Sequence, residues 1–360
     1  MHTLPPLLTP DHVLKPLLGL AMALSLALPA AQAAPQPALP TVCVWDPLGQ
    51  GGKLFDVARN YSWAMEAKGM PIKLRAYADE GVAAEDFKVG QCDGLLATSL
   101  RTRTWVPLTA ALDYGGAATI VKGDQVDIDA SYQVIGQAVR ALATPQAERL
   151  VVDGPHEIVG VVPAGATYML MRDRHLLKRG LAGTRMPAFD GDKLQLFLIA
   201  KAGGVPVSAN SRNFGTMFNN GNLDVVFAPA LAYQALELNK GIGTQGGISR
   251  FPLAFTSLQI VVRQGKFPKG FGQVSRQHWA DEFKLMTIVA RKAEAAIPTE
   301  QWVDYDGPEG ARFVALQRDS RIEAAKAGYF SKVGLTFMKR ARCKVSPEAT
   351  ECANRDELAW

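Results

Sequence analysis

Short apolar runs and helical periodicity alternate along residues 41–100. Val42–Trp45 is apolar throughout, as expected for a central strand of a parallel sheet. Residues 71–77 alternate between apolar and polar side chains, which is typical of a half-exposed strand, and residues 94–97 are again apolar. An amphipathic helix separates the first two segments. The pattern predicts a doubly wound α/β sheet in which the three strands lie in the order 2-1-3.

One pattern, Phe-x-x-Gly-x-x-Asp-x-x-x-Ala-x-x-Leu, occurs twice, at residues 87–100 and 218–231. Each copy fits the end of a helix, a glycine stop, a buried strand and the loop after it. Each also closes a unit that opens with a strand running into an aromatic–aspartate pair, Trp45-Asp46 or Phe189-Asp190. Two copies of one β-α-β-α-β unit predict two similar lobes, which is a statement about fold before it is one about function.

Two apolar stretches connect these units. Residues 157–171 are longer than an ordinary strand and are interpreted as a segment that crosses between lobes. Residues 253–262 form an extended return crossing, followed by an amphipathic helix that ends near Pro298 and by a helical region, 310–340, packed on the first lobe. Two crossing segments predict a hinged interlobe cleft. The predicted domains are lobe I (41–157 plus 255–345), lobe II (158–254) and a C-terminal tail (346–360).

The N-terminal segment, residues 1–33, has the pattern of a secretory signal peptide. An apolar run, Leu17–Leu28, precedes the small-residue site Ala31-Gln32-Ala33. A membrane anchor is the alternative, but the run is short of the ~20 residues that cross a bilayer. No later segment has the length or apolarity of a spanning helix, so we expect an exported, periplasmic protein that does not itself span the membrane.

Composition and charge narrow the class further. The 360 residues are 48% hydrophobic and 20% charged, as in an ordinary globular protein, and the length suits two domains. Loss of residues 1–33 removes one lysine and one aspartate, so the formal charge stays at +5. The excess positive charge is spread along the chain without a basic run. A nucleic-acid partner is therefore not expected.

Export makes the four cysteines candidates for disulfide bonds. Four cysteines allow three pairings. Cys43 and Cys92 belong to strands predicted to be neighbours, and Cys343 and Cys352 close a short loop, so these two pairs are favoured. Free buried thiols are the alternative. A lipid anchor on Cys43 is disfavoured, because Val42 stands where a lipoprotein signal has a small residue.

The sequence carries no recognisable catalytic set. It has no Gly-x-Ser-x-Gly motif, and the histidines beyond residue 33 have no metal-like spacing. Residues 49–53 resemble a phosphate-binding loop but lack its spacing and the hydroxyl residue after the lysine. We therefore predict neither an enzyme nor a bound metal or cofactor.

Loops at the carboxyl ends of the strands are the candidate ligand site, since open α/β sheets bind ligands there. In the first loop, Asp46 and Gly49 offer a carboxylate and a closely approachable backbone; Asp46 and Asp190 as helix caps are the alternative. In the second, Ser99, Arg101 and Arg103 could hold a carboxylate or phosphate, with a salt-bridged surface loop as the alternative. The corresponding loop of the second unit is apolar and offers Tyr233, either to a ligand or to packing.

Several motifs resemble a known family. Leu181-Ala-Gly-Thr-Arg185, Gly203-Gly-Val-Pro-Val207 and Gly221-x-x-Asp224 resemble the central domain of TRAP-type periplasmic solute-binding proteins, which have the type II periplasmic binding protein fold. Cys43-Val-Trp-Asp-Pro-Leu-Gly49, residues 83–94, Phe218-Asn-Asn-Gly and residues 266–273 resemble a further branch of solute-binding proteins, some of whose members are labelled as drug-efflux components. That second resemblance covers roughly residues 41–352.

The resemblance implies a two-lobed protein that captures a small solute and presents it to membrane transporter subunits. In TRAP-type proteins an arginine of this strand holds the substrate carboxylate, and Arg185 matches that position. An arginine expected in the crossing segment is replaced near Thr167 and Tyr168, and an asparagine expected after the Gly-x-x-Asp strand falls near Ala228. Arg101 and Arg103 of the other lobe are therefore expected to supply charge, and the aromatic residues of the pocket are Trp45, Tyr168 and Tyr233. A small anionic organic solute is the preferred ligand. An efflux-associated envelope factor or an enzyme on the same scaffold is the alternative.

Overall fold

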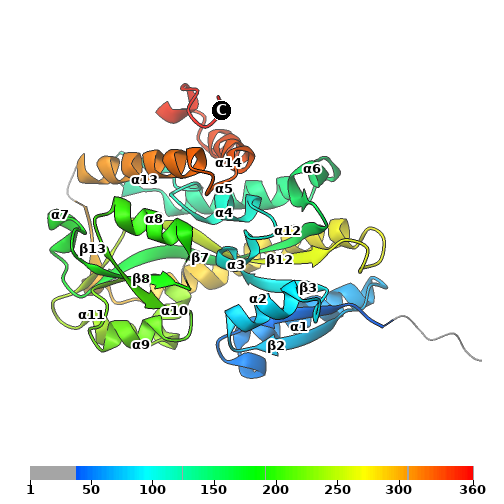
Figure 1. Cartoon of the computed structure of the whole chain (residues 1–360). Helices are drawn as coiled ribbons and strands as arrows, with labels where there is room; N and C mark the ends of the chain where they lie inside the picture. Colours follow the sequence, from blue (N-terminus) through cyan, green and yellow to red (C-terminus); the bar gives the residue numbers. More distant parts are fainter. Residues whose placement is uncertain (1–37, 124, 191, 306–307, 360) are drawn as a thin grey trace, which may run out of the picture. The chain divides into compact units, whose positions relative to one another are not determined.

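The computed structural model describes residues 38–123, 125–190, 192–305 and 308–359. Residues from Leu39 onward form one compact unit, shown in Figure 1. The predicted signal peptide lies outside the described residues. Within them, no helix is both long and apolar enough to cross a bilayer.

The first repeat unit runs from β1 to β3. Its elements are β1 (Thr41–Trp45), α1 (Lys53–Ala67), β2 (Lys73–Tyr77), α2 (Glu80–Lys88) and β3 (Gly94–Thr98). Strand β1 pairs in parallel with β2 on one side and with β3 on the other. The predicted order 2-1-3 is confirmed. It follows from the pattern of burial, because the uniformly apolar strands β1 and β3 are central and the alternating β2 is at the edge.

The second repeat unit runs from β8 to β10 with the same succession of elements. These are β8 (Arg185–Phe189), α8 (Lys193–Lys201), β9 (Val205–Ala209), α9 (Phe214–Asn219) and β10 (Val225–Pro229). Strands β8 and β9 form a separate parallel pair, whereas β10 joins the large sheet antiparallel to β7 (His156–Met171). The repeat therefore predicts the order of elements but not the way β10 is paired.

The repeated Gly-x-x-Asp motif has the same structural role in both units. Asp93 accepts the backbone N–H of Thr41 at 2.9 Å, and Asp224 accepts that of Arg185 at 2.8 Å. Each aspartate thus fixes the start of the first strand of its unit beside the start of the third. The motif's glycines stop the preceding helices with left-handed φ angles, +82° at Gly90 and +79° at Gly221, which glycine adopts without steric cost.

A mixed sheet connects the two units (Figure 1). Its strand order is β13-β11-β7-β12-β3-β1-β2, and β6 (Val152–Asp153) and β10 pair with β7 outside this order. The strands of the order not yet given bounds are β11 (Gly247–Ser249), β12 (Ala254–Arg263) and β13 (Trp302–Val303). The first part of β7 pairs with β12, and its last residues pair with β10 and β11. Strands β7 and β12 are the two predicted crossing segments, and the structure confirms them.

Helices cover both faces of this sheet. Among them are α4 (Leu108–Asp113), α5 (Ile128–Leu142), α12 (Phe271–Ala295), α13 (Pro308–Lys326) and α14 (Lys332–Val345). Shorter elements are α3 (Ser99–Thr102), α6 (Glu148–Val151), α7 (Leu176–Arg179), α10 (Ala230–Ala235), α11 (Asn239–Ile242), β4 (Val121–Lys122) and β5 (Gln125–Val126). Alternate residues of β1, β3 and β12 enter two different cores. Helix α1 and the first part of α12 belong to one of them, and α2, α5, α14 and the later part of α12 belong to the other.

The C-terminal helices contact the second repeat unit and the helices that follow the first. Helix α14 packs on α4 and α5, beside the first unit, as expected from the sequence, whereas α13 contacts α8 of the second unit. A small apolar core joins α4, α8, α13 and α14. It contains Ala110 and Ala111 of α4, Leu194 of α8, Ala324 of α13 and Leu335 of α14. Any movement of the units relative to each other must therefore involve α13 and α14. The lobe boundaries drawn from the sequence stay predictions.

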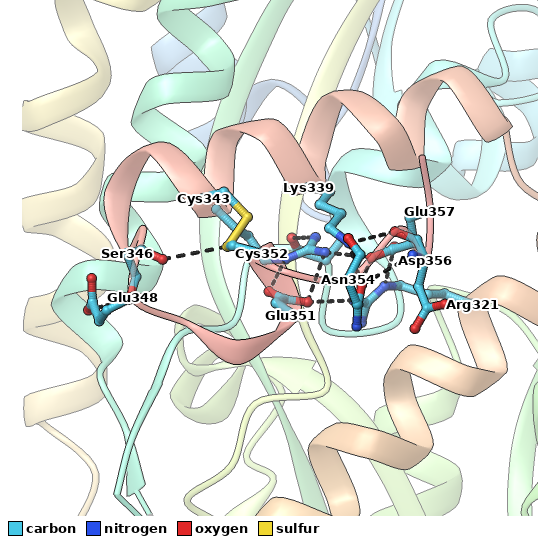
Figure 2. The surroundings of a disulfide bond; sticks show 12 residues. Arg321, Lys339, Cys343, Ser346, Glu348, Glu351, Cys352, Asn354, Asp356 and Glu357 are labelled. Atoms are coloured by element: carbon cyan, nitrogen blue, oxygen red, sulfur yellow. Dashed lines mark hydrogen bonds and ion pairs between the residues drawn. A yellow bond between two sulfur atoms is a disulfide. The ribbon is translucent and has the colours of Figure 1, made fainter. Parts of the chain in front are cut away.

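Both expected disulfide bonds are present. Cys43 of β1 pairs with Cys92, just before β3, and Cys343 of α14 pairs with Cys352 of the tail. Figure 2 shows that the second disulfide lies beside a group of charged side chains that holds the C-terminal tail. In that group, Glu357 accepts hydrogen bonds from Arg321 and Arg342, which are almost completely buried.

Candidate functional site

A cavity of about 360 Å³ lies where the end of β3, the start of α8 and the turn between α13 and α14 meet. Its walls thus come from both repeat units and from the C-terminal helices. The lining residues that matter for chemistry are Arg101, Arg103, Asp190, Asp192, Lys193 and Tyr329.

Arg101 and Arg103 reach the cavity because β3 runs directly into the single turn of α3. Thr98, the last residue of β3, is held by the buried carboxylate of Glu80, which accepts its N–H at 2.8 Å and its hydroxyl at 2.6 Å. That contact fixes the point at which the chain leaves the sheet. The two arginines, two positions apart, therefore face the second repeat unit together.

The second unit presents two aspartates at the end of β8. Asp190 pairs with Arg101 and Asp192 pairs with Arg103 across the cavity. Asp192 also caps α8, since its other oxygen accepts the N–H of Leu194 at 2.9 Å. Asp190 has a φ of +46°, a conformation that is uncommon for a residue other than glycine. Strained backbone of this kind tends to occur at functional sites.

Each arginine has a second carboxylate behind it, from its own side of the cavity. A Glu80 oxygen lies 3.7 Å from Arg101 Nε, and burial raises the pKa of Glu80 against the opposing effects of Thr98 and Arg101. Asp113 accepts from the N–H and hydroxyl of Ser257 at 3.1 and 2.7 Å. Burial raises the pKa of Asp113 to about 7, although Ser257, Ser99 and the charge of Arg103 act in the other direction.

Asp113→Asn is expected to flatten the pH dependence of stability between the ordinary aspartate pKa of 3.8 and about 7. Because the pKa is raised, the folded protein holds this proton more tightly than the unfolded chain does. The resulting stabilisation is complete below the unfolded-state pKa and is lost as pH rises through the folded-state pKa. Across that window the free energy of unfolding should fall, relative to the variant, by up to ~1.4 kcal/mol per pH unit. Urea unfolding of the wild type and the variant at several pH values across this range measures the difference. The prediction is refuted if the free energies of unfolding of the two proteins change with pH in parallel.

Only some of the ligand-binding residues predicted from the sequence lie at the cavity. Arg101 and Arg103 line the cavity, and Ser99 is buried beneath them. Asp46 is buried and accepts the N–H groups of Leu48 and Phe55 at 2.8 and 3.0 Å, so it holds the start of α1 as the capping alternative supposed. Gly49, in the same loop, does not line this cavity.

Three further predicted contacts lie away from the cavity. Tyr168 is buried with its ring centroid 4.8 Å from that of Trp302, and Tyr233 donates its hydroxyl to Gln301 at 2.7 Å. Arg185 donates from Nε and Nη2 to Asp224 at 3.0 and 2.6 Å. Its hydrogen bonds lower the pKa of Asp224, so this is an ionic pair. A role for these three residues in ligand binding stays a prediction, and Arg185 would have to leave Asp224 to fulfil it.

The sequence analysis missed most of the acidic side of the cavity. Asp190 was singled out only as the end of a repeated strand and a possible cap, whereas Asp192 is the cap of α8 and Asp190 faces Arg101. The signal was present as two matched pairs, Arg-x-Arg and Asp-x-Asp, at the ends of β3 and β8. Among the described residues, no cluster of histidine, cysteine and carboxylate side chains could hold a metal ion.

Two repeat units joined by two crossing strands, with a charged cavity where they meet, form the two-lobed fold of TRAP periplasmic solute-binding proteins. The structure matches a TRAP periplasmic solute-binding protein from Ralstonia eutropha with bound (S)-2-acetolactate, with a TM-score of 0.64 and 14% identity over 87% of this chain and 99% of that one. It also matches one from Rhodoferax ferrireducens with bound malonate, with a TM-score of 0.62 and 13% identity over 86% and 98%.

Sequence comparison identifies the family. Residues 62–357 match the model of the family described as solute-binding protein AdeT 1/2. The chain is 37% identical over 317 residues to the probable solute-binding protein AdeT1 of Acinetobacter baumannii, covering 87% of this chain and 100% of that one. The chain therefore belongs to the AdeT 1/2 family of solute-binding proteins.

Proposed function

We propose that this chain is an exported protein that captures a small organic solute bearing a carboxylate in the cavity between α3 and α8, and delivers it to a membrane transporter. The observation that carries the proposal is the pair Arg101 and Arg103. They come from one repeat unit, face the other across a cavity of about 360 Å³, and have partners there that a ligand could replace.

The chemistry of the arginines supports a carboxylate. A guanidinium binds a carboxylate through parallel charge-assisted hydrogen bonds, which fix orientation as well as contributing affinity. Both solved structures described above hold carboxylate ligands, acetolactate and malonate. Their low identity to this chain means that they support the fold and leave the solute itself to be tested.

Closure of the two lobes is the proposed mechanism of capture. A solute that binds Arg101 and Arg103 and also contacts the start of α8 has a higher affinity for the closed state than for the open one. The difference between these two affinities sets how far the solute shifts the population toward the closed state. The two crossing strands, β7 and β12, are the segments about which such closure would occur. Because α13 and α14 contact the second unit and the helices that follow the first, we infer that they follow this movement.

Arg103→Gln is expected to weaken solute binding by tenfold or more, because one charge-assisted hydrogen bond contributes about 1.5–3 kcal/mol. The measurement is a thermal-shift screen of the exported protein against organic acids, followed by calorimetry on any hit. A ligand at 100 times its Kd should add ~2.7 kcal/mol of stability to the wild type. Arg101→Gln should act in the same direction.

Arg185→Gln is the informative comparison for this screen. If Arg185 holds the carboxylate, as the family resemblance implies, its substitution should abolish the shift and those at 101 and 103 should matter less. The proposed cavity predicts the opposite ranking. Normal binding of every organic acid hit by the Arg101 and Arg103 variants would refute the proposed site.

A further inference from the structure

The two arginines of the cavity already have carboxylate partners. Asp190 and Asp192 face Arg101 and Arg103 from the second unit, while Glu80 and Asp113 lie behind the arginines in the first. Asp190 and Asp192 are the two carboxylates of the lining, and Lys193 at the exposed start of α8 is its third cation.

A purely anionic solute fits this arrangement poorly. To reach Arg103 it would displace Asp192, whose side chain is only 6% exposed, and leave that carboxylate without its cation. Removing one partner of a buried ion pair is costly, since the remaining charge is poorly hydrated. The solute's own negative charge would then lie close to that carboxylate, and like charges at such distances repel.

A solute with both charges avoids that cost. Its carboxylate can pair with one arginine while its ammonium pairs with the aspartate released from that arginine, so each charge in the cavity keeps an opposite partner. The aspartates suit this exchange. One oxygen of Asp192 stays on the α8 cap, which leaves the oxygen that now meets Arg103 for a cation. Asp190 is held toward the cavity by its unusual backbone conformation.

We propose that the solute is a zwitterion, whose carboxylate pairs with Arg101 or Arg103 and whose ammonium pairs with Asp190 or Asp192. This proposal rests on the proposed function and narrows its class of ligand. It also gives Asp190 and Asp192 a second role: in the absence of solute they occupy the arginines and hold the two units together, with Arg212 and Asp79, 3.7 Å apart, as a weaker exposed pair between the same units.

The test compares compounds that differ in one group. Calorimetry on the exported protein would use the common amino acids and 4-aminobutyrate, each beside its des-amino carboxylate and its decarboxylated amine, such as glutamate with glutarate and 4-aminobutyrate with butyrate and propylamine. We expect at least one amino compound to bind ten or more times more tightly than both of its counterparts.

Asp190→Asn and Asp192→Asn make the test specific. Asparagine tolerates the left-handed conformation of residue 190 and can still cap α8 at residue 192, so both variants should fold. The variant at the aspartate that holds the ammonium should weaken the amino compound by tenfold or more and leave its des-amino counterpart bound as well as before or more tightly. Asp304→Asn, which removes an exposed ion pair with Arg250 outside the cavity, is the matched control and should change neither.

Three results would overturn the proposal. Des-amino carboxylates that bind as tightly as their amino counterparts would refute the zwitterion and leave the proposed capture of a carboxylate intact. Equal weakening of both compounds by the aspartate variants would assign these residues to lobe closure alone. Binding of no carboxylate of either kind would refute the proposed function itself, and the zwitterion with it.

Discussion

Glu357→Ala is expected to lower the free energy of unfolding by about 3–5 kcal/mol, the usual result of removing one partner from a buried ion pair. Glu357 accepts from Arg321 Nε at 2.7 Å and from Arg342 Nη2 at 2.6 Å. Both arginine side chains are nearly inaccessible to water, and without Glu357 the two buried guanidinium groups would have to share the single carboxylate of Glu351. Burial alone would raise the pKa of Glu357, but the two arginines lower it below the usual glutamate value.

Glu357→Ala should destabilise the packing of α13 and α14 as well as the C-terminal tail. Arg321 also donates to the carbonyl of Gly115 at 2.9 Å, and Arg342 donates to that of Ala117 at 2.6 Å. These contacts connect α13 and α14 to the loop after α4. Figure 2 shows the carboxylates of the network, Glu351 and Glu357. Urea unfolding of wild type and variant measures the loss. Glu85→Ala is the control, because its exposed pair with Lys88 should contribute less than about 1 kcal/mol. A loss for Glu357→Ala as small as that of the control would mean that water replaces the carboxylate.

Burial through ion pairs, as in this network, cannot be predicted from the pattern of apolar residues. Residues 346–360 were assigned to a C-terminal tail. They have no apolar periodicity, which is the signal by which buried segments are found. Glu357 is nevertheless buried, through charges rather than through apolar contacts. Partner choice among isolated charges depends on which loops meet in space, and no local pattern records that.

The fold was more predictable than the site for the same reason. Uniform apolarity in β1 and β3 and alternation in β2 follow from whether a strand has one or two buried faces, so strand order could be inferred from residues 41–98 alone. The pairing of Cys43 with Cys92 followed from that order, and the pairing of Cys343 with Cys352 from their closeness in the sequence. The pairing of β10 with β7 could not be inferred, because a buried strand is equally apolar beside either neighbour.

At the site, the sequence identified the arginines and missed their partners. Arg101 and Arg103 follow a strand end, where ligands of α/β sheets are expected. Asp190 and Asp192 have an ordinary alternative as caps, and one of them does cap a helix. The family resemblance directed attention to Arg185, whose contact with Asp224 is equally explained by the repeated Gly-x-x-Asp motif that fixes strand starts in both units.

Replacing Cys43 and Cys92 together by alanine is expected to lower the free energy of unfolding by ~4 kcal/mol, the loop-entropy value for a separation of 49 residues. The bond joins β1 to the start of β3 across the centre of the first repeat unit, and both cysteines are buried in its core. Without the bond, the unfolded chain regains the freedom of the whole segment that contains α1, β2 and α2.

The second disulfide provides the matched comparison for this prediction. Cys343 and Cys352 are separated by 9 residues, for which the same relation gives ~2.6 kcal/mol. Urea unfolding of the two double-alanine variants, without reductant, should therefore show a larger loss for the first pair by roughly 1.5 kcal/mol. A larger loss for the second pair would contradict the loop-entropy account. It would mean that the Cys343–Cys352 bond stabilises the protein chiefly by keeping Glu351 and Glu357 in place beside Arg342, so that the tail network and its disulfide act as one unit.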